Sequence, residues 1–148
     1  MAVAVVGAVA GTRVLGYDDD LLRTLGARPK PIPDDRDTAL LEAAAIEQAQ
    51  LAVDLGVLAE RHEALDVAPL TAIAEEHLAA LGGAPRPAGT APADEPSEAA
   101  RTAADAWLAV SERRRDDVAL ATSSALVTVL ASLSASQRVV SEALRSRT

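Results

Sequence analysis

The sequence predicts an all-α protein built as a four-helix bundle, and composition and periodicity are the observations that predict it. Apolar residues make up 49% of the 148 residues, yet Phe is absent and Tyr17 and Trp107 are the only aromatics. A core of Ala, Leu and Val suits closely packed helices, because alanine has the highest helix propensity, whereas strands draw on β-branched and aromatic residues. Apolar side chains also recur at steps of three and four in four segments, which is the spacing of one helix face.

The N-terminal part of the chain, residues 1–36, carries the Gly and Pro residues typical of non-helical segments. Its start, MAVAVVGAVAG, is apolar but at about ten residues too short to span a bilayer. It resembles the core of a secretion signal with a small-residue cleavage site, although the positively charged leader is missing. A remnant of an export signal or a misplaced start is one interpretation, and a loosely packed segment is the other. We expect residues 29–33 to be an extended Pro-rich spacer and residues 37–148 to form the bundle.

The first two helices are expected at about 38–62 and 65–81. Asp37 is the expected N-cap of the first helix, and Gly82-Gly83 ends the second. The short loop between them predicts an antiparallel hairpin. Their apolar stripes are Leu41, Ala44, Leu51, Leu55 and Leu58 in the first helix, and Leu70, Ile73, Ala74, His77 and Leu81 in the second.

A stretch rich in Gly, Pro and Ala, residues 82–96, precedes the second pair of helices. It is longer than a usual helix–helix turn, so we expect it to cross the end of the bundle or to lie along its side. Residues 97–148 contain neither Gly nor Pro. We place a turn at 121–124, where Thr122 and Ser123 are good N-caps, with 115–117 as the alternative. The expected inward residues are Ala100, Ala103, Ala104, Trp107, Val110 and Val118 in a helix at about 97–121, and Leu126, Leu130, Leu133, Val140 and Leu144 in one at about 124–146.

The charge balance argues against nucleic acid and anionic membrane surfaces as partners. The formal net charge is −8, Lys30 is the only lysine, and the one basic cluster, 113–115, is followed at once by two aspartates. Nucleic-acid binding needs clustered Lys and Arg, so we expect no nucleic-acid partner. We interpret the arginine cluster as a solvated face, with an anion-binding site as the alternative. We also expect no integral membrane span. The absence of Cys excludes disulfides, thiol catalysis and a lipid-anchoring cysteine in this sequence.

Polar side chains on the apolar stripes are the candidates for chemistry. Glu47 and His77 lie on the predicted inward faces of the first two helices, where they could approach each other. Asp54 borders the same face, and Gln137 faces the core from the last helix. A di-iron bundle needs two Glu-x-x-His pairs plus two further Glu, and no Glu-x-x-His occurs here. We therefore expect Glu47 and His77 to be a buried polar pair that fixes helix register, with an Fe, Mn or Zn site as the alternative.

No other constellation points to catalysis. Trp107 is expected to fill the bundle centre as its one large side chain, with stacking on a ligand as the alternative. The serines of residues 123–136 lie in no Gly-flanked elbow, so we expect them to cap a helix or to permit close packing. The chain also lacks a phosphate-binding loop. We expect no cofactor and no catalytic residue, and the balance favours a non-enzymatic protein.

Three segments carry a family resemblance: EAAAIEQAQL, the run RHEALDVAPLTAIAEEHLAAL, and LASLSASQ. Over roughly residues 35–146 the chain resembles an uncharacterised ferritin-like domain family of actinobacteria, whose members are often exported proteins or lipoproteins. The resemblance implies a ferritin-like bundle of up-down-type helices with one longer linker between helices two and three. It also implies that Glu47 and His77 stand at former ligand positions. Such relatives tend to carry an acidic residue and a histidine where this chain has Gln137 and Val140.

These observations predict a ferritin-like helical bundle without an intact di-iron site, acting by binding a protein partner or by self-association as a homo-oligomer. The alternative is a divergent metal-binding protein that uses Glu47, Asp54 and His77. A third hypothesis is a small-molecule binding bundle with Trp107 lining the cavity. We expect a location in the cell envelope or outside the cell if the N-terminus is a signal remnant, and in the cytoplasm otherwise.

Overall fold

The computed structural model describes residues 34–147, and within this range it contains four α-helices, one short 3-10 helix and no strand. The helices are α2 (Asp35–Arg61), η1 (Glu63–Leu65), α3 (Ala68–Ala80), α4 (Pro96–Val118) and α5 (Ser124–Arg145). The predicted all-α class with four helices is therefore confirmed. The apolar N-terminal segment and the Pro-rich spacer lie outside the described residues.

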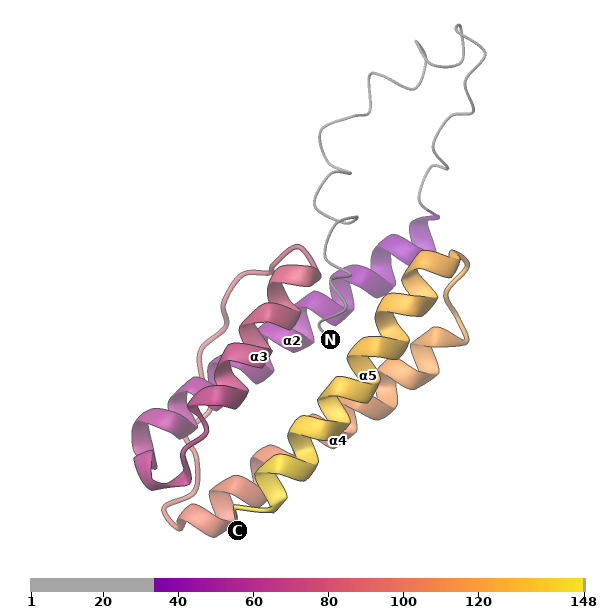
Figure 1. The fold of residues 1–148 in the computed structure, drawn as a ribbon. Helices are drawn as coiled ribbons and strands as arrows, with labels where there is room; N and C mark the ends of the chain where they lie inside the picture. The colour runs from indigo at the N-terminus through magenta and orange to yellow at the C-terminus, as the bar shows by residue number, and fades with distance from the viewer. Residues whose placement is uncertain (1–33, 148) are drawn as a thin grey trace, which may run out of the picture.

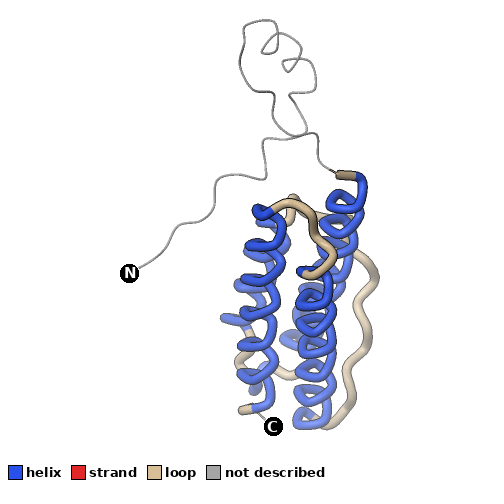
Figure 2. The backbone as a smooth tube through the Cα atoms, turned by 90° about the vertical axis from the view of Figure 1, so that its right-hand side faces the viewer, coloured by secondary structure: helices blue, strands red, loops and turns tan. Residues whose placement is uncertain are grey.

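The four helices lie side by side along a common direction (Figure 1). α2 and α3 run antiparallel to each other, and so do α4 and α5. α3 and α4 run in the same direction, because residues 81–95 return along the outside of the bundle before α4 begins (Figure 2). Hydrogen bonds agree with the antiparallel α4–α5 pair, since Ser111 meets Ser134 and Ser141 meets Ala104. None of these helices combines the length and the apolar character that crossing a membrane requires.

The first helix starts earlier than predicted, and Asp37 has a different role. Asp34 is the N-cap of α2, and its carboxylate accepts the N–H of Arg36 at 3.0 Å. Asp37 lies inside the helix, and its two carboxylate oxygens accept the N–H groups of Thr122 and Ser123 at 2.7 and 2.8 Å. It therefore caps the start of α5 rather than its own helix, and the expected N-cap assignment is wrong.

The other helix boundaries follow local backbone chemistry. α3 begins three residues later than predicted, after a 3-10 turn and Asp66, whose φ of 47° is left-handed. The predicted stop at Gly82-Gly83 is confirmed, with φ values of 86° and 76° that favour glycine. Ser123 caps α5, as predicted, by accepting the N–H of Leu126 at 3.1 Å. The alternative turn at 115–117 is wrong, because α4 continues to Val118.

The long connection is fastened to α2 along the side of the bundle. Gln50 Nε2 donates to the carbonyl of Ala88 at 3.3 Å, and the Asp54 carboxylate accepts the N–H of Thr90 at 2.6 Å. Further along, Arg61 pairs with Asp94 and the His62 ring contacts the carbonyl of Ala93. We call residues 88–93 the strap. Of the two predicted courses for the linker, the structure shows the one along the side.

Two apolar clusters form the core at opposite ends of the bundle. The larger cluster is centred on Trp107 and contains Leu51, Leu55, Leu58, Val140 and Leu144. The smaller one lies where α5 begins and contains Ala44, Ala45, Leu81, Leu126, Leu130 and Leu133. Every helix carries polar side chains between the two clusters, alongside the buried apolar side chains of Ala49 and Leu78. This intervening layer positions the candidate site.

Candidate functional site

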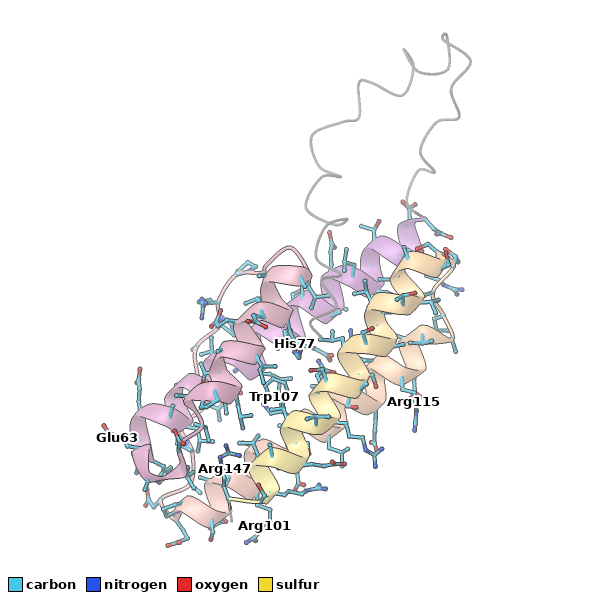
Figure 3. The ribbon with its side chains drawn as sticks, viewed as in Figure 1. Glu63, His77, Arg101, Trp107, Arg115 and Arg147 are labelled. Atoms are coloured by element: carbon cyan, nitrogen blue, oxygen red, sulfur yellow. The ribbon has the colours of Figure 1, made fainter. Side chains whose placement is uncertain are left out.

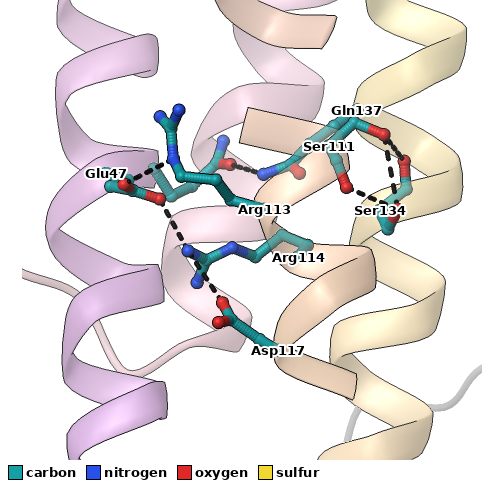
Figure 4. Close-up of polar contacts among 8 residues, drawn as sticks. Glu47, Ser111, Arg113, Arg114, Asp117, Ser134 and Gln137 are labelled. Atoms are coloured by element: carbon teal, nitrogen blue, oxygen red, sulfur yellow. Dashed lines mark hydrogen bonds and ion pairs between the residues drawn. The ribbon is translucent and has the colours of Figure 1, made fainter. Parts of the chain in front are cut away.

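Each of the four helices contributes polar side chains to the layer between the two apolar clusters. We call this set the central polar layer, and Figure 4 shows most of it. Its members are Glu47 and Gln48 from α2, His77 from α3, Ser111 and Arg114 from α4, and Ser134, Ser136 and Gln137 from α5. They are nearly all paired with one another, so the layer is a set of internal contacts and not an open pocket.

The charged part of the layer is a carboxylate held by two arginines. Glu47 accepts hydrogen bonds from Arg113 Nε at 2.9 Å and from Arg114 Nη2 at 2.6 Å, one on each carboxylate oxygen (Figure 4). Arg114 Nη2 also lies 3.0 Å from the carboxylate of Asp117. Arg114 is buried, with 3% of its side chain exposed, whereas Glu47 is 32% exposed. A buried guanidinium requires such carboxylate partners, since desolvating an unpaired charge costs several kcal/mol.

Arg114 is nevertheless incompletely satisfied. Its Nε and Nη1 are buried and lack a hydrogen-bond partner among the described residues. A guanidinium carries five N–H donors in a fixed fork, and here Nη2 alone makes both ion pairs. Holding the charge in this position therefore depends on Glu47 and Asp117 together.

The uncharged part of the layer is a chain of amides across the bundle centre. Gln137 Nε2 donates to Gln48 Oε1 at 3.0 Å, and Gln48 Nε2 donates to the carbonyl of Ala74 at 3.1 Å. This chain joins α5 to α2 and α2 to α3. Both glutamines are fully buried, and Gln137 Oε1 has no partner in residues 34–147. The predicted inward position of Gln137 is thus observed, and its role is structural pairing.

His77 pairs with a serine across the α3–α5 contact. Its Nε2 lies 2.8 Å from Ser136 Oγ, while Nδ1 is buried without a partner among the described residues. Burial lowers the pKa of His77 below its ordinary value, because desolvation penalises the charged ring, and the nearby carboxylate of Glu76 opposes this in part. The imidazole is therefore held in its neutral form near pH 7.

Serines draw α4 and α5 together through the same layer. Ser111 Oγ donates to the carbonyl of Ser134 at 2.8 Å, and Ser134 Oγ donates to the carbonyl of Ser111 at 2.8 Å. Ser141 Oγ donates to the carbonyl of Ala104 at 2.7 Å. Each hydroxyl thus bonds the backbone of the facing helix, which fits the expectation that serines here permit close packing.

The structure separates the residues that the sequence proposed as one site. Glu47 does not pair with His77: its partners are Arg113 and Arg114, and the partner of His77 is Ser136. Asp54 faces the strap, where it accepts from Thr90 N–H and from Gln50 Nε2. The expected Glu47–His77 pair is therefore wrong. A rotation of about 100° per residue explains it, since Gln48 takes the inward direction and Glu47 turns toward α4.

These donors do not fit a pair of metal ions. A di-iron bundle draws four carboxylates and two histidines inward, whereas the layer offers one carboxylate with both oxygens already bound to guanidinium groups. The buried charge of Arg114 also repels a divalent cation. Within residues 34–147, no group of three or more His, Asp or Glu side chains could hold a metal ion.

Sequence reasoning missed Arg114, Gln48 and the long-range role of Asp37. For Arg114 the signal was present: it follows Val110 by four residues and Trp107 by seven, so it continues the inward stripe of α4. We interpreted the whole 113–115 cluster as solvated, and this is wrong for Arg114 alone. Gln48 likewise lies midway between Ala44 and Leu51 on the most buried line of α2. No local pattern reveals that Asp37 binds amides 85 and 86 residues away.

Trp107 is buried, with 1% exposed, and lies among the helices (Figure 3). It also borders a cavity of about 340 Å³ between α2, α4 and the strap. Both predicted roles, core wedge and cavity wall, therefore fall on the same side chain. A smaller hollow of about 200 Å³ adjoins the cavity along the α2–α4 contact and reaches Glu47 and Arg113.

No protein-family model matches this chain, and comparison with curated proteins and with solved structures gives no match. The proposals that follow rest on the residues described above.

Proposed function

We propose that this protein is a non-catalytic binding module built on a ferritin-like four-helix bundle without an intact di-iron site. One observation carries the proposal: the cations that neutralise Glu47 in the central polar layer are Arg113 and the buried Arg114, both side chains of the chain itself. A bundle that used this carboxylate to hold iron would have to expel a buried guanidinium first.

The order and direction of the helices support the ferritin-like part of the proposal. Ferritin-like bundles have one long crossover connection, and here residues 81–95 connect two antiparallel pairs in this way. The term up-down therefore applies to the two helices of each antiparallel pair, and not to the connection between the pairs. The resemblance to the actinobacterial ferritin-like family agrees with this arrangement, and we retain membership of that family as part of the proposal.

The chemistry of the central polar layer supports the non-catalytic part. Its serines bond backbone carbonyls, its amides bond each other, and its histidine lies apart from its one carboxylate. A hydrolytic site needs a nucleophile next to a base that is itself oriented by a third group. Ser136 and His77 are in contact, but no described acidic group accepts from Nδ1, which is unpartnered.

The cavity beside Trp107 supports a binding role. Ligand sites are mostly apolar concavities of roughly 300–1,000 Å³ with a few polar groups, and this cavity of about 340 Å³ has that character. Self-association is the other binding mode we propose, because Ile46 and Val139 are large apolar side chains more than half exposed on α2 and α5.

Metal content tests the proposal directly. The full chain, purified without chelator, is expected to contain no stoichiometric Fe, Mn or Zn by elemental analysis. Adding these ions should leave its melting temperature unchanged. One metal ion or more per chain, or a saturable increase in melting temperature that Glu47→Gln abolishes, would overturn the proposal. Light scattering across a concentration series then separates self-association from monomeric binding, since only the former raises the mass.

A further inference from the structure

The cavity beside Trp107 lies where α4 presents alanines toward α2 and the strap. Ala99, Ala103 and Ala106 face it from α4, and Leu51, Leu55 and Leu58 face it from α2. Alanines leave the space between the helices unfilled. The strap covers this space from the outside, and strap residues 90–93 form the outer wall of the cavity.

The strap lies close against α2. Gly89 passes over α2 so tightly that a Cβ there would lie 2.5 Å from Val57 Cγ2. Before Gly89 the carbonyl of Ala88 accepts from Gln50 Nε2, and after it the strap is held through Thr90 N–H to Asp54 and through the carbonyl of Ala93 to His62.

The polar groups that line the cavity determine which end group a ligand can carry. They are the carboxylate of Asp54 and the hydroxyls of Thr90 and Thr102. Asp54 Oδ1 accepts from both Thr90 N–H and Gln50 Nε2. Its Oδ2 accepts from no side chain or amide of residues 34–147. A partly buried carboxylate with a free oxygen favours a donor and repels an anion.

We propose that this cavity binds an elongated apolar molecule with one hydrogen-bond-donating end group, an alcohol or a primary amine, placed against Asp54. The apolar body lies between α2, α4 and the strap, in the cavity that the nearly buried Trp107 borders. A carboxylate-ended chain is disfavoured, because the one cation of the adjoining hollow, Arg113, is already paired with Glu47. This inference rests on the proposed function and names its ligand class.

Trp107 is the only tryptophan, so its emission reports occupancy of the cavity directly. The full chain is titrated with 1-decanol below its solubility limit, and with decylamine and decanoate below their micelle concentrations. We expect saturable changes in emission for the alcohol and the amine, and affinity weaker by about tenfold or more for decanoate, since a hydrogen bond to a charged group is of that strength. Equal affinity for all three, or no saturable change with any, would overturn the inference.

Two variants locate the site. Ala103→Leu fills the cavity and should reduce affinity for decanol by at least about tenfold, whereas Ala125→Leu, on an exposed position of α5, should leave it unchanged. Asp54→Asn keeps the acceptor for Thr90 N–H and removes the charge, so the preference for amine over decanoate should disappear. If Ala103→Leu does not fold, the comparison of Asp54→Asn with the parent, in their affinity for decylamine over decanoate, alone tests the inference. A metal-free, folded protein that binds no amphiphile refutes only this ligand class, whereas stoichiometric metal refutes the proposed function.

Discussion

Arg114 Nη2 lies 2.6 Å from Glu47 Oε2, and together with the Arg113 contact to the same carboxylate it joins α4 to α2 at the level that separates the two apolar clusters. The arginine is buried, and its carboxylate partner is not fully so. In such a pair, the desolvated charge carries the energetic penalty when the partner is lost.

We predict that Glu47→Met destabilises the fold by about 3 kcal/mol, because it leaves Arg114 buried with Asp117 as its only carboxylate. Arg114→Met should cost less, because Glu47 keeps Arg113 and partial contact with water. The double variant should recover most of the loss, since two apolar side chains replace a buried ion pair. Urea unfolding of all four proteins completes the cycle. Additive effects of the two substitutions would contradict a direct interaction.

The amide chain makes a second, independent prediction. Gln137→Met leaves Gln48 Oε1 buried without its donor, and Gln48→Met leaves Gln137 Nε2 without its acceptor. Each substitution should cost about 1–3 kcal/mol, the penalty for an unsatisfied buried polar group. The double variant should be nearly as stable as the parent, because it removes both partners with little change in shape. A double variant that loses the sum of the two penalties would show that the amides contribute separately.

The sequence predicted the apolar part of this fold well. Leu130, Leu144 and Trp107 were placed inward from spacing alone, and all are buried, because apolar burial is read from periodicity. Helix ends were predictable where glycine or serine fixes them, as at Gly82 and Ser123.

The polar part was less predictable for physical reasons. One residue along α2 separates Glu47 from Gln48, and about 100° of rotation decides which faces the centre. Partners such as Arg114 for Glu47 depend on which helices become neighbours, and single-helix spacing does not contain that information. The position of the strap against Asp54 is equally a tertiary property.

Gly89 and Gly56 offer a matched pair for testing the strap. A Cβ at Gly89 would lie 2.5 Å from Val57 Cγ2 and 3.1 Å from Val53 Cγ1, whereas nothing lies within 4 Å of one at Gly56. Gly89→Ala should therefore destabilise by about 1–3 kcal/mol, the usual cost of overpacking. Gly56→Ala, inside α2, should stabilise by up to about 1 kcal/mol through helix propensity. Thermal melts measure both, and Val57→Ala should rescue Gly89→Ala. Equal changes in melting temperature for Gly89→Ala and Gly56→Ala would contradict the close contact between the strap and α2.

Asp37 gives the fold an acid-sensitive link between α2 and α5. The N–H of Thr122, followed by that of Ser123, holds the pKa of Asp37 below its ordinary value of 3.8, although burial opposes the shift. As the pH falls through this range, the unfolded chain takes up the proton first, so stability present above about pH 4 is lost toward the folded pKa. Asp37→Asn should be less stable than the parent near neutral pH, and the difference should shrink with acidification. Urea midpoints from pH 7 to pH 2.5 measure this, and a constant difference would contradict the link.

His77 predicts a second pH dependence, in a higher window. Its pKa is lowered below the ordinary 6.5 because desolvation in the α3–α5 contact disfavours the imidazolium, whose Nδ1–H would find no acceptor among the described residues. Below about pH 6.5 the unfolded chain therefore binds a proton that the folded chain resists, and stability falls as the pH is lowered toward the folded pKa. His77→Gln removes this titration and should flatten the stability profile between pH 7 and pH 5. His62 is present in both proteins and cancels in the comparison, so parallel profiles for parent and variant would mean that His77 takes up its proton as readily in the fold as outside it.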